Sequence, residues 1–193
     1  MVGPTISIGY KSQQRSGGGN HLVGSFGLDA ETVIGICRTM VRDFSRHGIE
    51  KIVFVNGHYE NYQFIYEGVD LALRDLAGNS SRPTVMLMSY WDFVTREVIA
   101  DLYPDGFPGW DVEHGGVMET SLMLRYFPDL VWMDRLVDHP AAELPQYDIL
   151  PVDASITPES GCLSSGKVST AEKGQILSDS IVAGMSSAIK SRF

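Results

Sequence analysis

The amino-acid sequence predicts an α/β protein with a mostly parallel sheet and helices on both of its faces. Two uninterrupted apolar runs, KIVFV at 51–55 and TVMLMSYW at 84–91, are typical of strands that are buried on both faces of such a sheet. Around them, apolar residues recur at helical spacing. Strands and helices that alternate at these lengths imply right-handed crossovers, which bring the strands together in parallel.

Four helices are expected from the spacing of the apolar residues. The first begins at Asp29, a residue type that caps helix N-termini, and ends at His47 and Gly48, because glycine readily takes the left-handed capping conformation. The other three helices are expected over 61–76, over 117–127 and from about 170 to the end. Two further runs, TISIGY and LVWMD, are interpreted as short strands over 5–10 and 130–134.

Composition and charge exclude several classes of protein. With 193 residues, of which 44% are hydrophobic and 20% charged, the chain is expected to form one domain over 1–193. Its net charge of −9 and the lack of a basic stripe argue against nucleic acid and against an anionic membrane surface as partners. The apolar runs are too short to span a bilayer, and no signal peptide is visible. Cys37 and Cys162 lack metal-ligand spacing and are interpreted as buried or idle thiols of a cytoplasmic protein rather than as a disulfide.

A histidine and a glutamate follow the first predicted strand, in the stretch VNGHYEN. His58 and Glu60 offer an imidazole and a carboxylate, which suit Zn²⁺, Mn²⁺ or a related divalent ion. The alternative is that Asn56 and His58 satisfy the backbone of the loop, while Glu60 places negative charge at the N-terminus of the next helix. Sites in parallel sheets form at the carboxyl ends of strands, and Trp91 follows the second strand in the same way.

A second polar group lies in the stretch GWDVEHGGVMETS, before the third predicted helix. His114 could donate or accept a proton there, with Glu119 as its partner. The alternative is that Glu113 or Asp111 caps the helix and that His114 is a surface residue. Aromatic residues near the strand ends could also form the wall of a slot for a flat ligand, although such residues more often border the core. They are Tyr59, Tyr90, Trp91, Phe93 and Trp110.

Five segments, in this order along the chain, resemble the creatininase family, the creatinine amidohydrolases. They are GYKSQQRSGGGNH, VNGHYEN, SYWDF, YPDGFPGWDVEHGGVMETSLML and VDHP, and the resemblance covers essentially the whole sequence. It implies a three-layer α/β/α fold and a cytoplasmic homohexamer. It also implies a metal-dependent hydrolase that converts creatinine to creatine by reversible opening of the lactam ring. In that family a hydroxide that bridges two divalent ions, zinc or manganese, attacks the ring.

The resemblance assigns roles to individual residues. His58 and Glu60 are the expected metal ligands, and Glu60 is counted with the catalytic residues. His114 is the expected catalytic histidine, and Glu119 is the carboxylate that works with it. The residues expected to bind the substrate are Ser16, Tyr59, Trp91, Trp110, Asp111 and His114.

The remaining ligands of the family, a Glu-x-His pair and a bridging aspartate, have no counterpart before the glycine-rich segment of this sequence. We therefore expect an N-terminally truncated domain that lacks the first strand region and is inactive on its own. Two alternatives remain open. One is another amidohydrolase of the superfamily, either a formamide hydrolase or a peptide-trimming enzyme, although the tryptophan-rich segments favour creatininase. The other is a noncatalytic remnant that only oligomerises.

Overall fold

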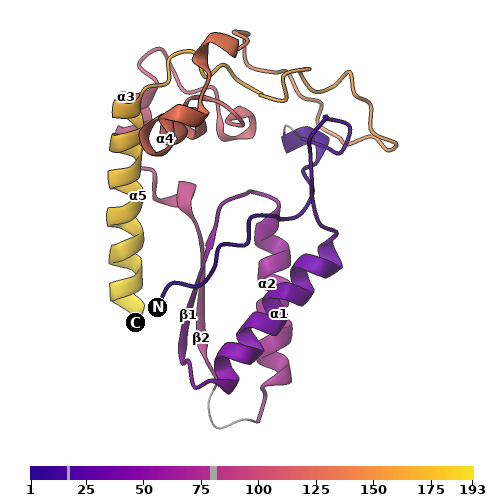
Figure 1. The fold of residues 1–193 in the computed structure, drawn as a ribbon, viewed down its shortest axis with the longest axis vertical. Helices are drawn as coiled ribbons and strands as arrows, with labels where there is room; N and C mark the ends of the chain where they lie inside the picture. The colour runs from indigo at the N-terminus through magenta and orange to yellow at the C-terminus, as the bar shows by residue number, and fades with distance from the viewer. Residues whose placement is uncertain (17, 79–81) are drawn as a thin grey trace. The chain divides into compact units, whose positions relative to one another are not determined.

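The computed structural model describes residues 1–16, 18–78 and 82–193, which form two compact units (Figure 1). The first unit contains residues 1–11, 26–92 and 193, and the second contains 12–25 and 93–192. The start of the glycine-rich loop at Gly17 and the predicted connection over 79–81 lie outside the described residues. The prediction of a single domain over 1–193 stays a prediction.

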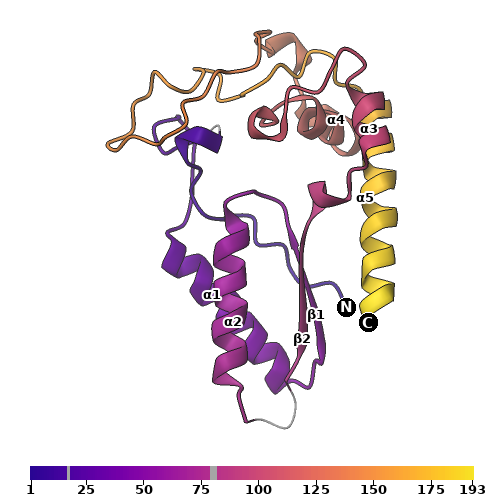
Figure 2. The same ribbon diagram turned by 180° about the vertical axis from the view of Figure 1, so that it is seen from behind.

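The first unit is built on two parallel strands. Strand β1 (Lys51–Asn56) pairs with β2 (Thr84–Ser89) in register from Lys51 opposite Thr84 to Asn56 opposite Ser89. Helices α1 (Ala30–Arg46) and α2 (Asn61–Asp75) lie together on one side of the strands in Figures 1 and 2. The predicted helix, strand, helix, strand order of this unit is confirmed, and so is the parallel pairing.

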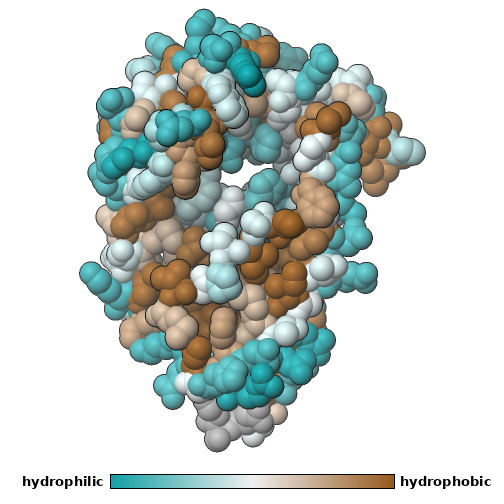
Figure 3. All heavy atoms as spheres, in the orientation of Figure 1, coloured by the Kyte–Doolittle hydropathy of each residue, from teal (hydrophilic) through white to brown (hydrophobic). Residues whose placement is uncertain are grey.

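The predicted burial of the first strand on both faces is wrong for part of β1. Ile52 is buried, but the Val55 side chain is 58% exposed. On the face seen in Figure 3, apolar residues gather over the first unit between hydrophilic ones. A β-branched residue favours a strand whether or not its face is covered, so composition alone overstates burial.

Two apolar clusters hold α1 and α2 against the strands. One is centred on Val33, Cys37 and Ile65, and the other on Val41, Ile52 and Ala72. Cys37 is a buried free thiol, as predicted, and burial raises its pKa to about 11 because the thiolate would lose its hydration.

The two helices of this unit approach each other closely at Gly68 of α2. A Cβ atom at this position would lie 2.6 Å from the carbonyl oxygen of Ile34 and 2.8 Å from the Cβ of Cys37. Further along both helices, the guanidinium of Arg38 donates two hydrogen bonds of 2.7 Å to the carboxylate of Asp75. These bonds lower the pKa of Asp75. The lack of a side chain at Gly68 therefore allows the contact on which the apolar clusters depend.

The predicted strand over 5–10 is wrong. Among the described residues this segment forms one isolated bridge, between Tyr10 and Leu28. Besides the backbone bonds of this bridge, a side chain holds the segment, because the N–H of Tyr10 donates a 2.8 Å hydrogen bond to the Oδ1 atom of Asn61. A β-rich composition makes a strand only where a partner edge runs alongside it. The second strand also ends earlier than predicted, at Ser89, and Tyr90–Phe93 form a 3₁₀ turn, η2.

The second unit is mainly helical. Helix α4 (Val117–Tyr126) packs against α5 (Ala171–Arg192), and a Cβ atom at Gly174 would lie 2.1 Å from the carbonyl oxygen of Ser121. The helices predicted over 117–127 and from about 170 to the end are thus confirmed. None of the helices in the described part of the chain is long and apolar enough to cross a membrane.

Two features of the second unit differ from the sequence prediction. The predicted strand over 130–134 is wrong, because the chain there contains the 3₁₀ turns η4 (Pro128–Leu130) and η5 (Met133–Arg135). Helix α3 (Arg96–Leu102) was not predicted. At seven residues it is too short to show a helical period, and its clearest signal is Thr95, whose hydroxyl accepts a hydrogen bond from the N–H of Val98.

The helix crossing at Gly68 can be tested by comparing two glycines. Alanine has the higher helix propensity, by about 1 kcal/mol, so propensity alone would make Gly68→Ala stabilising. We expect it instead to lower the free energy of unfolding by about 1–3 kcal/mol, because the methyl group meets backbone. Urea unfolding followed by circular dichroism measures the change.

Gly35 of α1 provides the matched control, because a Cβ atom there would meet no atom within 4 Å. Gly35→Ala is expected to raise the free energy of unfolding by up to about 1 kcal/mol. The same sign of change for both variants would contradict the close crossing.

Candidate active site

In the first unit, a buried hydrogen bond joins the carboxyl ends of the two strands. Asn56 and Ser89 are each 1% exposed, and the Nδ2 group of Asn56 donates a 3.1 Å bond to the Oγ atom of Ser89. The Oδ1 atom of Asn56 accepts a bond from the N–H of His58, which turns the chain away from the sheet. The loops after β1 and β2 therefore leave from the same edge, as predicted.

His58 and Glu60 face each other at this edge. The Nδ1 atom of His58 lies 2.7 Å from the Oε2 atom of Glu60, and the Glu60 side chain is only 4% exposed. Burying a carboxylate is costly unless an opposite charge or a donor meets it, so this contact stabilises the pair. Glu60 also occupies the N-cap position of α2, but it makes no side-chain capping bond there. Its carboxylate is used by His58 instead.

The pair fits a divalent metal ion in the chemistry of its atoms. One imidazole nitrogen and one carboxylate oxygen, both buried and directed at each other, match the donors that zinc and manganese take. Within the described ranges of the chain, no cluster of three or more His, Cys, Asp or Glu residues could hold a metal ion. The first unit therefore provides two candidate ligands. The alternative interpretation is also met in part, since Asn56 does satisfy the loop backbone.

Aromatic side chains accompany this edge of the sheet. Tyr59, between the two candidate ligands, is 73% exposed, which excludes a role in the core. Beyond β2, the rings of Tyr90 and Trp91 meet edge to face, with centroids 5.1 Å apart. Tyr59 and Trp91 are thus held near the ends of neighbouring strands, where the sequence predicted an aromatic wall.

In the second unit, two short turns carry three of the predicted substrate-binding residues. Turn η1 (Gln14–Ser16) lies beside η3 (Trp110–Val112), which brings Ser16 into the same region as Trp110 and Asp111. Trp110 is 45% exposed, and its ring contacts that of Phe107 with centroids 5.1 Å apart. Asp111 is also exposed.

The position of η1 depends on a residue that the sequence did not single out. Gln14 is 4% exposed, and its amide group meets the backbone of Asp153 twice. Its Nε2 group donates to the carbonyl of Asp153, and its Oε1 atom accepts from the N–H of the same residue. The two residues are 139 positions apart, so no local pattern could have predicted the contact.

His114 lies in a tight turn before α4. The carbonyl oxygen of His114 accepts a 2.9 Å hydrogen bond from the N–H of Leu163. Gly115 has a φ of 65°, a backbone conformation that favours glycine, and its N–H donates a 2.6 Å bond to the Oε2 atom of Glu119. Glu119 therefore fixes the backbone next to His114. The predicted roles of both residues in proton transfer stay predictions.

Glu113, the residue before His114, accepts a backbone N–H from the first turn of α4, which meets the alternative interpretation in part, although the N-cap residue is Gly116. The Oε1 atom of Glu113 accepts a 2.7 Å bond from the N–H of Met118, and its Oε2 atom accepts a 2.5 Å bond from the hydroxyl of Tyr103. Burial raises the pKa of the Glu113 carboxyl. Burial and the nearby charge of Glu113 raise the pKa of Tyr103. Burial also raises the pKa of Cys162, so this thiol is not an activated nucleophile.

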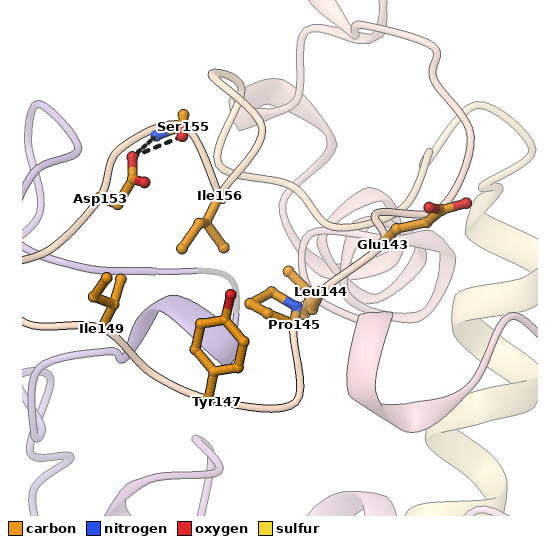
Figure 4. Close-up of a pocket in the computed structure, with 8 residues that line it drawn as sticks. All are labelled: Glu143, Leu144, Pro145, Tyr147, Ile149, Asp153, Ser155 and Ile156. Carbon is orange, nitrogen blue, oxygen red and sulfur yellow. Dashed lines mark hydrogen bonds between the residues drawn. The ribbon is translucent and has the colours of Figure 1, made fainter.

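A separate cavity of about 490 Å³ lies in the second unit (Figure 4). The segment over 143–156 forms it, and Tyr147 and Ile149 contribute apolar surface. Asp153 stands at its border, where its Oδ1 atom accepts bonds from the N–H and the hydroxyl of Ser155. None of the predicted site residues is among the described residues that line it.

The structure thus gathers the predicted residues in two groups, one in each unit. The first unit holds His58, Tyr59, Glu60 and Trp91 near the carboxyl edge of its sheet. The second unit holds Ser16, Trp110, Asp111, His114 and Glu119 on turns and at the start of α4.

Comparisons with known proteins agree on one family. The model of the creatininase family, described as creatinine amidohydrolase, matches residues 1–189. The sequence is 53% identical over 196 residues to a creatinine amidohydrolase from Pseudomonas putida, and the match covers 100% of this chain and 75% of the relative.

Solved structures give the same result. A manganese creatininase superposes with a TM-score of 0.95 at 52% identity, over 98% of this chain and 75% of its own length. A mutant creatininase complexed with creatine superposes with a TM-score of 0.91 at 53% identity, over 95% and 73% of the two chains. A further mutant creatininase, of the Zn–Zn type, has a TM-score of 0.92. These matches confirm the predicted α/β class, and this chain belongs to the creatininase family.

Proposed function

We propose that this protein hydrolyses creatinine to creatine by reversible opening of the lactam ring when the remaining metal ligands of the family are also supplied. The observation that carries the proposal is the buried contact between His58 and Glu60 at the carboxyl edge of the sheet. It places two donors for a divalent ion in a chain that is 53% identical to a creatinine amidohydrolase. The similar structure that contains creatine supports the same substrate class.

His58 and Glu60 would be ligands of the two divalent ions that the family resemblance implies. The similar creatininases of manganese and Zn–Zn type indicate which metals to expect. When bound, such an ion polarises a carbonyl group and lowers the pKa of water, which favours hydrolysis of an amide at neutral pH. The low exposure of Glu60 supports this role, because a water-excluded carboxylate binds a cation more strongly than a solvated one.

The second unit supplies proton transfer. The reaction breaks the bond between the lactam carbonyl carbon and the ring nitrogen, and that nitrogen must gain a proton as it departs. His114 carries an imidazole, a group that can accept and donate a proton, and we assign this transfer to it. Glu119 supports it by fixing the N–H of Gly115, which limits the freedom of the turn.

Aromatic and polar side chains would orient the substrate. Creatinine is planar, and Tyr59, Trp91 and Trp110 provide flat faces that can stack on it. Tyr59 and Trp110 are exposed and therefore accessible to a ligand. Ser16 and Asp111 offer a hydroxyl and a carboxylate for the polar edge of the ring, and the closeness of their two turns supports a shared role.

We also propose that the protein works in the cytoplasm as a homohexamer, as the family resemblance implies. Large apolar side chains exposed in the second unit, among them Phe127, Leu130 and Trp132, support an assembly, because such residues mark contact surfaces when they gather. Light scattering of the purified protein measures the mass directly.

His58→Ala tests the metal role. The metal-loaded variant is expected to lose bound zinc or manganese, together with creatinine hydrolysis, because one of the two donors at the edge of the sheet is gone. Its circular dichroism spectrum should stay unchanged. Metal content by mass spectrometry and a creatinine–creatine assay measure the two losses.

The matched control for the metal test is His47→Ala. His47 is an exposed residue that follows α1, so its loss should change neither metal content nor activity. Normal metal content and turnover in His58→Ala would overturn the assignment.

His114→Asn tests proton transfer. Turnover should fall on the order of 10²–10⁴-fold, the usual effect of losing a general acid or base. Metal content should remain that of the parent protein, which separates the two histidines. A loss of metal would instead identify His114 as a ligand, and unchanged turnover would remove it from the mechanism.

A further inference from the structure

Glu113 ties the turn that carries His114 to two different parts of the second unit. One carboxylate oxygen accepts a hydrogen bond from the N–H of Met118, in the first turn of α4. The other accepts the hydroxyl of Tyr103, which follows α3. The side chain directly before His114 therefore connects the start of α4 with the end of α3.

The backbone after His114 lies close against this carboxylate. A Cβ atom at Gly116 would lie 2.4 Å from the Oε2 atom of Glu113 and 2.5 Å from the Oγ atom of Ser164. At Gly115 it would lie 2.6 Å from the Sγ atom of Cys162. The turn is thus packed both against Glu113 and against the segment over 162–164.

The remaining backbone groups of the turn are fixed as well. The carbonyl of His114 accepts from Leu163, and the N–H of Gly115 donates to Glu119. Among these hydrogen bonds of the turn, the bond between Glu113 and Tyr103 connects it to the end of α3. If it were lost, the turn would keep its links to α4 and to Leu163 but would lose its link to Tyr103.

An ordinary helix cap does not account for this arrangement. In α3, the cap is a single 3.3 Å bond between exposed residues, from the N–H of Val98 to the hydroxyl of Thr95. Glu113 makes two shorter bonds from a half-buried position, and the N-cap position of α4 is occupied by Gly116 instead. Removing a carboxylate from water is costly, and the two bonds offset that cost only while both partners stay in place.

We propose that Glu113 and Tyr103 are positioning residues, which hold the turn of His114 in the orientation that the reaction needs. The inference rests on the proposed function, because it requires His114 to transfer a proton. Neither residue is assigned a contact with the substrate. Their effect on turnover comes through the backbone of His114.

The test compares Glu113→Ala, Glu113→Gln and Tyr103→Phe in the metal-loaded protein. Glu113→Ala removes both bonds and should lower kcat about 10–100-fold with little change in KM, because small misplacements of a reacting group cost this much. Tyr103→Phe removes one bond and should give a smaller loss. Glu113→Gln should rescue most of kcat. Its amide oxygen can accept from Met118, and its NH₂ group can donate to the oxygen of Tyr103.

Thr95→Ala is the matched control, because it removes the cap of another helix in the same unit. It should lower Tm, as loss of a cap does, and leave kcat unchanged. The pH profile of kcat is the second measurement. The profile should keep its shape in Glu113→Gln, because the proposal assigns the effect to the position of the His114 turn and not to the charge of Glu113.

Three results would overturn the inference. The first is a fall in Tm for Glu113→Ala without a fall in kcat, which would show that Glu113 only stabilises the start of α4. The second is a kcat for Glu113→Gln as low as that of Glu113→Ala with a shifted pH profile, which would assign the effect to charge. The third is full activity in Tyr103→Phe. If Glu113→Ala does not fold, the Glu113→Gln and Tyr103→Phe variants decide the question. Unchanged turnover in His114→Asn would instead refute the role of His114, and a metal-loaded parent protein without creatinine hydrolysis would refute the proposed function itself.

Discussion

The parallel pairing of β1 with β2 is the constraint on which the first unit depends. Because the strands are in register up to Asn56 and Ser89, their last residues lie side by side and can share a buried hydrogen bond. That bond leaves the Oδ1 atom of Asn56 directed at the loop, where it accepts the N–H of His58. The direction of the loop, and with it the contact between His58 and Glu60, follows from the end of the sheet.

In the second unit, His114 is held by a turn before a helix rather than by the end of a strand. Glycines in this turn allow neighbouring segments to approach closely. Carboxylates accept hydrogen bonds from backbone N–H groups and restrict the turn further. Gly115 and Glu119 form one such pair. Glu113 adds a second restraint that begins outside the helix, at Tyr103. Both units thus fix chemistry-bearing residues through the backbone next to them.

The buried polar groups explain why these arrangements are rigid. Asn56, Glu60 and Gln14 are each less than 9% exposed, and each has a hydrogen-bond or ion-pair partner that is also held by the fold. Leaving such a group unsatisfied costs about 1–3 kcal/mol, more when it is charged. Displacing any of these side chains would therefore be unfavourable, which keeps the edge of the sheet and the turn η1 in place.

The sequence by itself determined the four longer helices, the two paired strands and the residues able to carry chemistry, but not the short helix α3. Helical spacing and apolar runs are local, and the short segments around His58 and His114 contain their own donors. The tertiary structure decided which contacts hold them. Asn56 meets Ser89 across 33 positions and Gln14 meets Asp153 across 139, so neither pair leaves a local pattern. The same reason explains the wrong strand over 5–10: its composition suits a sheet, but a strand exists only where another edge pairs with it.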